Sequence, residues 1–214
     1  MKILVILAQK GGSGKTTLAV HMAVCAARQK RRTALIDIDP QVSAFNWNES
    51  RDEGRKLDAA KAEVGQIPAL LQQAKDGGID LAIIDTAPHS DSAAAIAAQY
   101  ANLVLIPCRP ARFDLDAIAS TVQIATVAKK SAAVVINAAP RGKLAKEARV
   151  ALERQGIIVI DTVLHQRVAY SHAVIDGRSV HEYEPNGKAA AEIDELYNHI
   201  TRLLGYRQAR GKAA

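Results

Sequence analysis

One short segment constrains the fold of this chain more than any other, and it reads Gln9-Lys10-Gly11-Gly12-Ser13-Gly14-Lys15-Thr16-Thr17. It follows an apolar run, Lys2–Ala8, and precedes an Ala-rich amphipathic stretch, Thr16–Gln29. A strand, a glycine loop, a Lys-Thr pair and a helix in this order predict a phosphate-binding loop, because glycines let backbone N–H groups turn inward around phosphate oxygens. Lys15 is then expected on the β and γ phosphates, and the Thr16 hydroxyl on Mg²⁺. A glycine-rich turn without a ligand is the alternative.

The loop departs from the common GxxxxGK[ST] pattern in an informative way. That pattern would place a glycine at position 9, where this chain has Gln9, while Lys10 and the Gly11-Gly12 pair are additions to it. The residues expected to bind the nucleotide phosphates are Gly11, Gly12, Ser13, Gly14, Lys15, Thr16 and Thr17.

Short aliphatic runs alternate along the chain with longer Ala-rich stretches, which favours an α/β fold with a doubly wound, mostly parallel sheet and helices on both faces. The runs are continuously apolar, as is typical of strands buried on both faces. The expected strands are 2–8, 33–37, 81–85, 103–107, 133–137 and 157–160. The expected helices are 16–29, 43–51, 66–75, 91–100, 114–129, 143–155 and 187–204. We expect a single domain over residues 1–214, with a flexible basic tail at 206–214.

Carboxylates follow the second and third expected strands. Asp37 and Asp39 lie two residues apart in Leu35-Ile36-Asp37-Ile38-Asp39-Pro40-Gln41, so an extended backbone directs both to one side. Asp39-Pro40 is also a plain turn signal. Asp85 ends a second apolar strand, as in a Walker B strand whose carboxylate holds Mg²⁺, although such an aspartate can instead cap the next helix.

These motifs together resemble the deviant Walker A loop and the DxDPQ segment of the ParA/MinD group of P-loop ATPases. The resemblance implies that Lys10 reaches the partner's phosphates across a nucleotide-sandwiched dimer, where a solvated loop lysine is the alternative. It further implies that Asp39 orients the attacking water and that Asp37 supports the Mg²⁺ shell. Asn137, at the end of the fifth expected strand, resembles the residue that hydrogen-bonds adenine, although it can also start a turn.

The charge of the chain is compatible with a nucleic-acid partner. Its formal net charge is +6, its sequence pI is about 9.4 and only 4% of its residues are aromatic, which favours contacts to phosphates over base stacking. A basic helix face is more often simply solvated. The candidate DNA-binding residues are Lys143, Lys146, Arg149, Arg154 and Arg167.

Resemblance to the ParA group extends over nearly the whole chain, including the 162–167 segment, which resembles the loop that flanks the base, and the 168–185 region. It implies a bacterial, nucleoid-associated cytoplasmic ATPase that uses ATP and Mg²⁺ and hydrolyses ATP slowly alone. The ATP-bound homodimer is expected to bind DNA nonspecifically and to position a plasmid, chromosome or other cargo. A ParB-like adaptor on the cargo would stimulate hydrolysis.

Two other classes of function remain open on the sequence. A MinD-like membrane-cycling ATPase would use an amphipathic C-terminal helix, and Ile193, Leu196, Tyr197, Ile200 and Leu203 do form an apolar face, although burial against the sheet explains that face more simply. A metabolic or iron–sulfur P-loop enzyme would need paired cluster cysteines, whereas Cys25 and Cys108 lie far apart in apolar surroundings typical of reduced core thiols. We expect no stable membrane partner.

Overall fold

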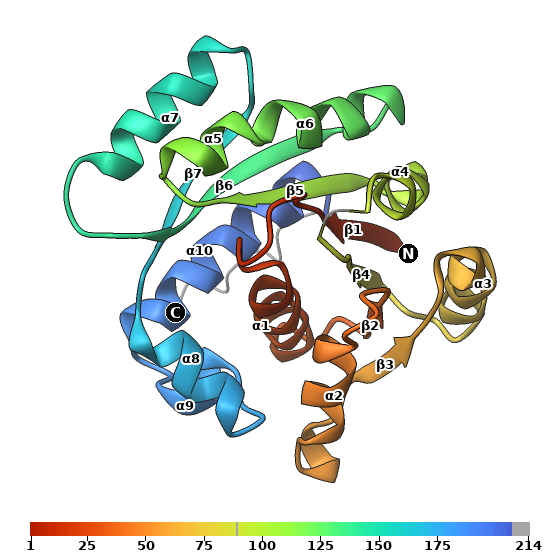
Figure 1. Cartoon of the computed structure of the whole chain (residues 1–214). Coiled ribbons are helices and arrows are strands. Elements are labelled where there is room, and N and C mark those ends of the chain that lie inside the picture. Colours follow the sequence, from red (N-terminus) through yellow and green to blue (C-terminus); the bar gives the residue numbers. More distant parts are fainter. Residues whose placement is uncertain (89, 207–214) are drawn as a thin grey trace.

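The computed structural model describes residues 1–88 and 90–206, and this part of the chain forms a seven-stranded sheet (Figure 1). The strand order is β3-β2-β4-β1-β5-β6-β7, and all neighbouring strands are parallel, which confirms the predicted doubly wound α/β class. The strands are β1 (Lys2–Ile6), β2 (Thr33–Asp37), β3 (Asp58–Lys61), β4 (Leu81–Asp85), β5 (Leu103–Cys108), β6 (Ala132–Ala139) and β7 (Val159–His165).

Helices cover both faces of the sheet (Figure 1). One layer packs into the core that holds Leu4, Ile83 and Leu105, and the other into the core that holds Val5 and Ile84. This alternation of residues within β1 and β4 shows that each strand is buried on both sides, which explains the continuous apolar runs. The first layer contains α1 (Lys15–Arg28), α2 (Ser43–Glu49), α8 (Val168–Ile175), α9 (Val180–Tyr183) and α10 (Lys188–Leu203). The second contains α3 (Ile67–Asp76), α4 (Asp91–Tyr100), α5 (Arg112–Asp116), α6 (Ile118–Val127) and α7 (Leu144–Arg154).

Several element boundaries differ from those expected. The helix expected over 114–129 is two helices, α5 and α6, which meet at Ala117. The last strand begins and ends later than 157–160, because it pairs with β6 through register shifts and continues to His165. Strand β3 is not predicted by the sequence: its residues, Asp-Ala-Ala-Lys, include no large apolar side chain, and it lies at an edge of the sheet, where two of its four residues are exposed.

The C-terminal helix α10 uses its apolar face inside the fold. Ile193, Leu196, Tyr197 and Ile200 are fully or almost fully buried in the same core as α1, as the simpler sequence interpretation predicted. Leu203, the fifth residue of the expected face, is instead 52% exposed. Of the expected basic tail, Tyr206 is described, and its hydroxyl donates to the Asp80 carbonyl at 2.7 Å. Residues 207–214 lie outside the described residues. Among the described helices, each is too short or too polar to cross a bilayer.

Candidate functional site: the phosphate loop and its carboxylates

The predicted phosphate loop and the predicted carboxylates meet at one edge of the sheet. Strand β1 leads into the loop and lies between β4 and β5, while β2 lies on the other side of β4. In the strand register Asp37 pairs with Asp85, and Asp85 pairs with Ile6. The carboxyl ends of three adjacent strands therefore deliver both aspartates to the start of the loop, where ligands bind in open α/β sheets.

The backbone of the loop requires glycine at two positions. Gly12 and Gly14 have φ angles of 70° and 94°, in the region that disfavours side chains. At Gly14 a β-carbon would also come within 2.3 Å of the Asn137 Nδ2 atom. Because Gly14 immediately precedes α1, this conformation sets the direction in which the helix N-terminus and its free N–H groups point.

Lys15, the first residue of α1, is buried among the site's carboxylates. Burial lowers the pKa of its ammonium group, and the nearby Asp85 and Asp39 carboxylates raise it in opposition. A cation that has already lost much of its hydration can bind a phosphate at a smaller desolvation cost. Ser13 is also buried, and its hydroxyl has no hydrogen-bond partner among the described residues.

Asp85 is the carboxylate best suited to hold a metal ion. It is 0% exposed, and neither of its oxygens has a hydrogen-bond partner within residues 1–88 and 90–206. Burial raises its pKa to about 7, while Thr16 and Lys15 act in the opposite direction. Such an unpaired buried carboxylate is costly unless a cation compensates it, and carboxylate and hydroxyl oxygens are the ligands that Mg²⁺ prefers. Asp85 and Thr16 therefore fit a magnesium site.

Asp37 differs from Asp85 because both of its oxygens are already engaged. They accept hydrogen bonds from the backbone N–H groups of Asp39 and Phe45, each at 3.0 Å. Asp37 thereby satisfies the N-terminus of α2, and burial raises its pKa although these bonds oppose the shift. The structure thus places Asp37 beside Asp85, in a position to orient the loop that carries Asp39. Its predicted support of the Mg²⁺ shell stays a prediction.

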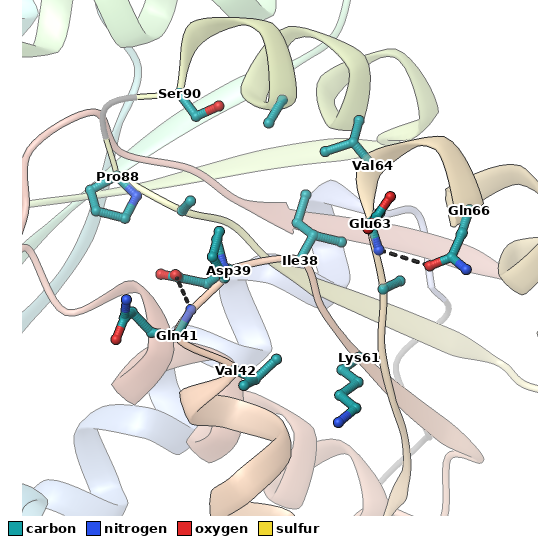
Figure 2. Close-up of a pocket in the computed structure, with 14 residues that line it drawn as sticks. Ile38, Asp39, Gln41, Val42, Lys61, Glu63, Val64, Gln66, Pro88 and Ser90 are labelled. Atoms are coloured by element: carbon teal, nitrogen blue, oxygen red, sulfur yellow. Dashed lines mark hydrogen bonds between the residues drawn. The ribbon is translucent and has the colours of Figure 1, made fainter.

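Asp39 lies half-buried at the wall of a cavity of about 860 Å³, with one carboxylate oxygen accepting from the Gln41 N–H at 2.9 Å (Figure 2). The cavity lies between the loop after β2, the segment after β3 and the segment that begins α4. Val42, in the first of these, has a φ of 46°, which is strained for a β-branched residue. Asp39 therefore sits on a strained loop with access to solvent.

Asn137 reaches the phosphate loop from β6. Its side-chain Nδ2 donates to the Ser13 carbonyl at 2.7 Å, a contact across the sheet that the sequence did not reveal. Asn137 also borders a second cavity of about 220 Å³, together with Gly12, Gly14, Thr17, Arg109 and the segment 164–167. The amide of Asn137 thus supports the loop, and its predicted contact with adenine stays a prediction.

Lys10 and Gln9, at the deviant positions of the loop, differ in their surroundings. Lys10 is exposed, as a residue that reaches a second molecule must be. The Gln9 side chain donates to Asp91, at the start of α4, and accepts from Ser120 in α6. Glutamine at position 9 therefore anchors the start of the loop to the second helical layer, which explains its presence where the common pattern has glycine.

The candidate DNA-binding residues fall into two groups. Lys143, Lys146 and Arg154 are exposed on α7 and its N-cap and form no ion pair within the described residues. Arg149 pairs with Asp161 at 2.5 Å, and Arg167 pairs with Glu192 at 2.5 Å. The last two guanidinium groups are thus already engaged, in contrast to the first three cations.

Comparisons with known proteins agree with this geometry. The model for the CobQ/CobB/MinD/ParA nucleotide binding domain matches residues 4–180. Maintenance of carboxysome distribution protein A from Gloeobacter kilaueensis is 33% identical over 95% of this chain and 94% of its own length. MinD from Pyrococcus horikoshii, solved with Mg-ADP, has a TM-score of 0.78 at 16% identity, covering 95% and 97% of the two chains. An ATP complex of a Cyanothece McdA variant has a TM-score of 0.75 at 17% identity, covering 98% of each.

Proposed function

This chain belongs to the CobQ/CobB/MinD/ParA nucleotide-binding family, and from that premise we propose that it is a ParA-like positioning ATPase that binds Mg²⁺ and ATP. The observation that carries the proposal is the convergence of Lys15, Asp85 and Asp39 at the carboxyl ends of β1, β4 and β2. Phosphoryl transfer to water requires a cation that binds the phosphates, a carboxylate that holds the metal ion and a carboxylate that orients the water.

Each residue has a separate task in the proposed reaction. The loop amides and Lys15 hold the β and γ phosphates, and Thr16 with Asp85 would hold the metal ion. Magnesium supplies charge neutralisation between the two phosphates. Asp39 accepts a hydrogen bond from the attacking water and aligns it with the γ phosphorus, and Asp37 fixes the backbone of Asp39.

Lys10 is proposed to complete the site of a second copy. An additional cation stabilises charge that develops on the transferring phosphoryl group, and an exposed lysine can supply it only after dimerisation. Lys10→Ala should therefore leave ATP affinity within about threefold and lower the hydrolysis rate at least about 100-fold. Titration calorimetry and a phosphate-release assay test this, with Lys75→Ala, at an exposed lysine of α3, as the control. If Lys10→Ala hydrolyses ATP at the wild-type rate, the proposed role is wrong and Lys10 is simply a solvated loop residue.

The DNA partner is proposed from the exposed cations of α7 and from the net charge of +6. Two copies in an ATP-bound dimer would present twice as many phosphate contacts as one copy, so nucleotide binding would gate DNA binding. An electrophoretic mobility assay on random duplex DNA tests this in Mg·ATP, Mg·ADP and no nucleotide. We expect a shift with ATP alone, and equal binding in all three states would refute the gating.

The two groups of cations should differ in their salt dependence. Lys146→Ala removes an exposed charge, so the slope of log affinity against log salt should fall by about 0.9 for each phosphate that Lys146 binds. Arg149→Ala removes a guanidinium that already pairs with Asp161 and donates to the Ile160 carbonyl at 2.6 Å, so the slope should change much less. Fluorescence anisotropy over a salt series measures both, and equal slopes for Lys146→Ala and wild type would remove Lys146 from the interface.

The cargo is proposed to be a large protein assembly positioned through a ParB-like or functionally equivalent adaptor. The supporting observation is the 33% identical relative whose name refers to carboxysome distribution, which favours a protein body over a plasmid or chromosome. Nucleoid association in a bacterial cytoplasm follows from the proposed DNA binding. A MinD-like membrane cycle finds less support, because four of the five residues of the apolar face of α10 are buried in the core and Leu203 alone of the five is exposed.

A further inference from the structure

Glu192, on α10, is the acceptor for an unusual number of donors from one short segment. Its carboxylate accepts from the His165 backbone N–H at 3.2 Å and lies 2.8 Å from His165 Nδ1. It also accepts from Arg167, through Nε at 3.1 Å and Nη2 at 2.5 Å, and from the Tyr170 hydroxyl at 3.3 Å. All of these donors come from the end of β7 and the start of α8, so one side chain holds this whole turn against α10.

The surroundings of Glu192 favour the charged form of its carboxylate. Glu192 is only 9% exposed, and burial alone would raise its pKa, yet the hydrogen bonds from Arg167 and His165 bring the pKa below its ordinary value. Removing the charge of a buried group that is bonded to several donors costs stability, because it leaves the Arg167 guanidinium without its partner. The turn is therefore fixed by an ionic interaction in addition to packing.

The three residues bonded to Glu192 line the 220 Å³ cavity beside the phosphate loop. His165, Arg167 and Tyr170 line it together with Gln166, the loop glycines Gly12 and Gly14, and Asn137. Glu192 itself is not among the lining residues, and it acts on the cavity only through the residues it binds. The cavity also borders Gly12, Gly14 and Thr17 of the phosphate loop. When the phosphates of a nucleotide occupy the loop, the cavity therefore offers space for the nucleoside part.

We propose that Glu192 is a positioning residue that holds the 165–167 segment as the wall against which the nucleoside part of the nucleotide binds. The inference rests on the proposed nucleotide binding. The residues proposed to hold the phosphates lie in the loop and at the start of α1. The hydrogen bonds of Glu192 go instead to His165, Arg167 and Tyr170, so its effect should fall on the nucleoside and spare the phosphates.

Titration calorimetry with two ligands separates these contributions. Mg·ATP probes the whole site, and Mg·tripolyphosphate probes the phosphate loop alone. In Glu192→Gln, which keeps the size of the side chain and removes its charge, ATP affinity should fall about 10-fold or more. Tripolyphosphate affinity should stay within about twofold. Glu195→Gln, at an exposed glutamate of the same helix, is the matched control and should bind both ligands as wild type does.

A second variant keeps the test decisive if Glu192→Gln fails to fold. Arg167→Ala removes the half-buried partner of Glu192 from the same ion pair. It should also lower the affinity for ATP and leave the affinity for tripolyphosphate unchanged. Combined with Glu192→Gln, it should cost less than the sum of the two single changes. Unchanged ATP affinity in both variants, or an equal decrease for both ligands, would overturn the positioning role. Failure of the wild-type protein to bind either ligand would instead overturn the proposed nucleotide binding.

Discussion

Replacing Lys15 with alanine should weaken Mg·ATP binding by about 100-fold or more and so abolish every nucleotide-dependent property of the protein. The ammonium group is buried at the mouth of the phosphate loop, and charge-assisted hydrogen bonds to two phosphates are among the strongest that a side chain can make. Its removal would also leave Asp85 and Asp39 without their neighbouring cation, which acts to lower the pKa of Asp85. Repulsion between the phosphates and these carboxylates would weaken binding further.

Titration calorimetry of Lys15→Ala against wild type measures this effect directly. Lys75→Ala, at an exposed lysine of α3, is a matched control for the removal of one positive charge. An ATP affinity within about threefold of wild type would contradict the assignment of the loop as the phosphate site.

Replacing Asp39 with alanine should lower the rate of ATP hydrolysis by about 100-fold to 10,000-fold while ATP still binds. The carboxylate lies half-buried at the edge of the large cavity and supplies no hydrogen-bond donor to the phosphates, so its removal abolishes water orientation and leaves binding in place. The variant should accumulate in the ATP-bound state.

Single-turnover hydrolysis with radiolabelled ATP separates binding from chemistry in Asp39→Ala. Asp52→Ala, in an exposed segment between α2 and β3, controls for the removal of an acidic side chain. Hydrolysis at the wild-type rate by Asp39→Ala would assign the orientation of water to another group.

Local patterns in the sequence were enough to predict which residues lie together at the centre of this candidate site. The spacing of the glycine loop identified Lys15 and Thr16, and the apolar strands that end in Asp37 and Asp85 have the bounds that the sequence indicated. Both signals depend on neighbouring residues, which is why periodicity and spacing are enough to find them. Parallel strands then bring their carboxyl ends together, so the predicted residues converge.

Contacts between distant segments could not be predicted in the same way. The bond from Asn137 to Ser13 joins β6 to the phosphate loop, and the Glu192 contacts join α10 to the end of β7. A single sequence carries no signal for such pairs, because the fold alone determines which side chains meet. The difference between Asp37 and Asp85 could not be predicted either, because both aspartates end similar apolar strands. In the structure the oxygens of Asp37 accept from backbone N–H groups, whereas those of Asp85 have no hydrogen-bond partner among the described residues.

The most direct test of the central claim, that ATP switches this protein into a dimer, is the mass of Asp39→Ala in solution. Light scattering coupled to gel filtration measures it in Mg·ATP, in Mg·ADP and without nucleotide. A positioning ATPase of this kind should show twice its chain mass of 22.9 kDa in Mg·ATP and the single chain mass in the other two conditions. One unchanged mass in all three conditions would contradict the claim.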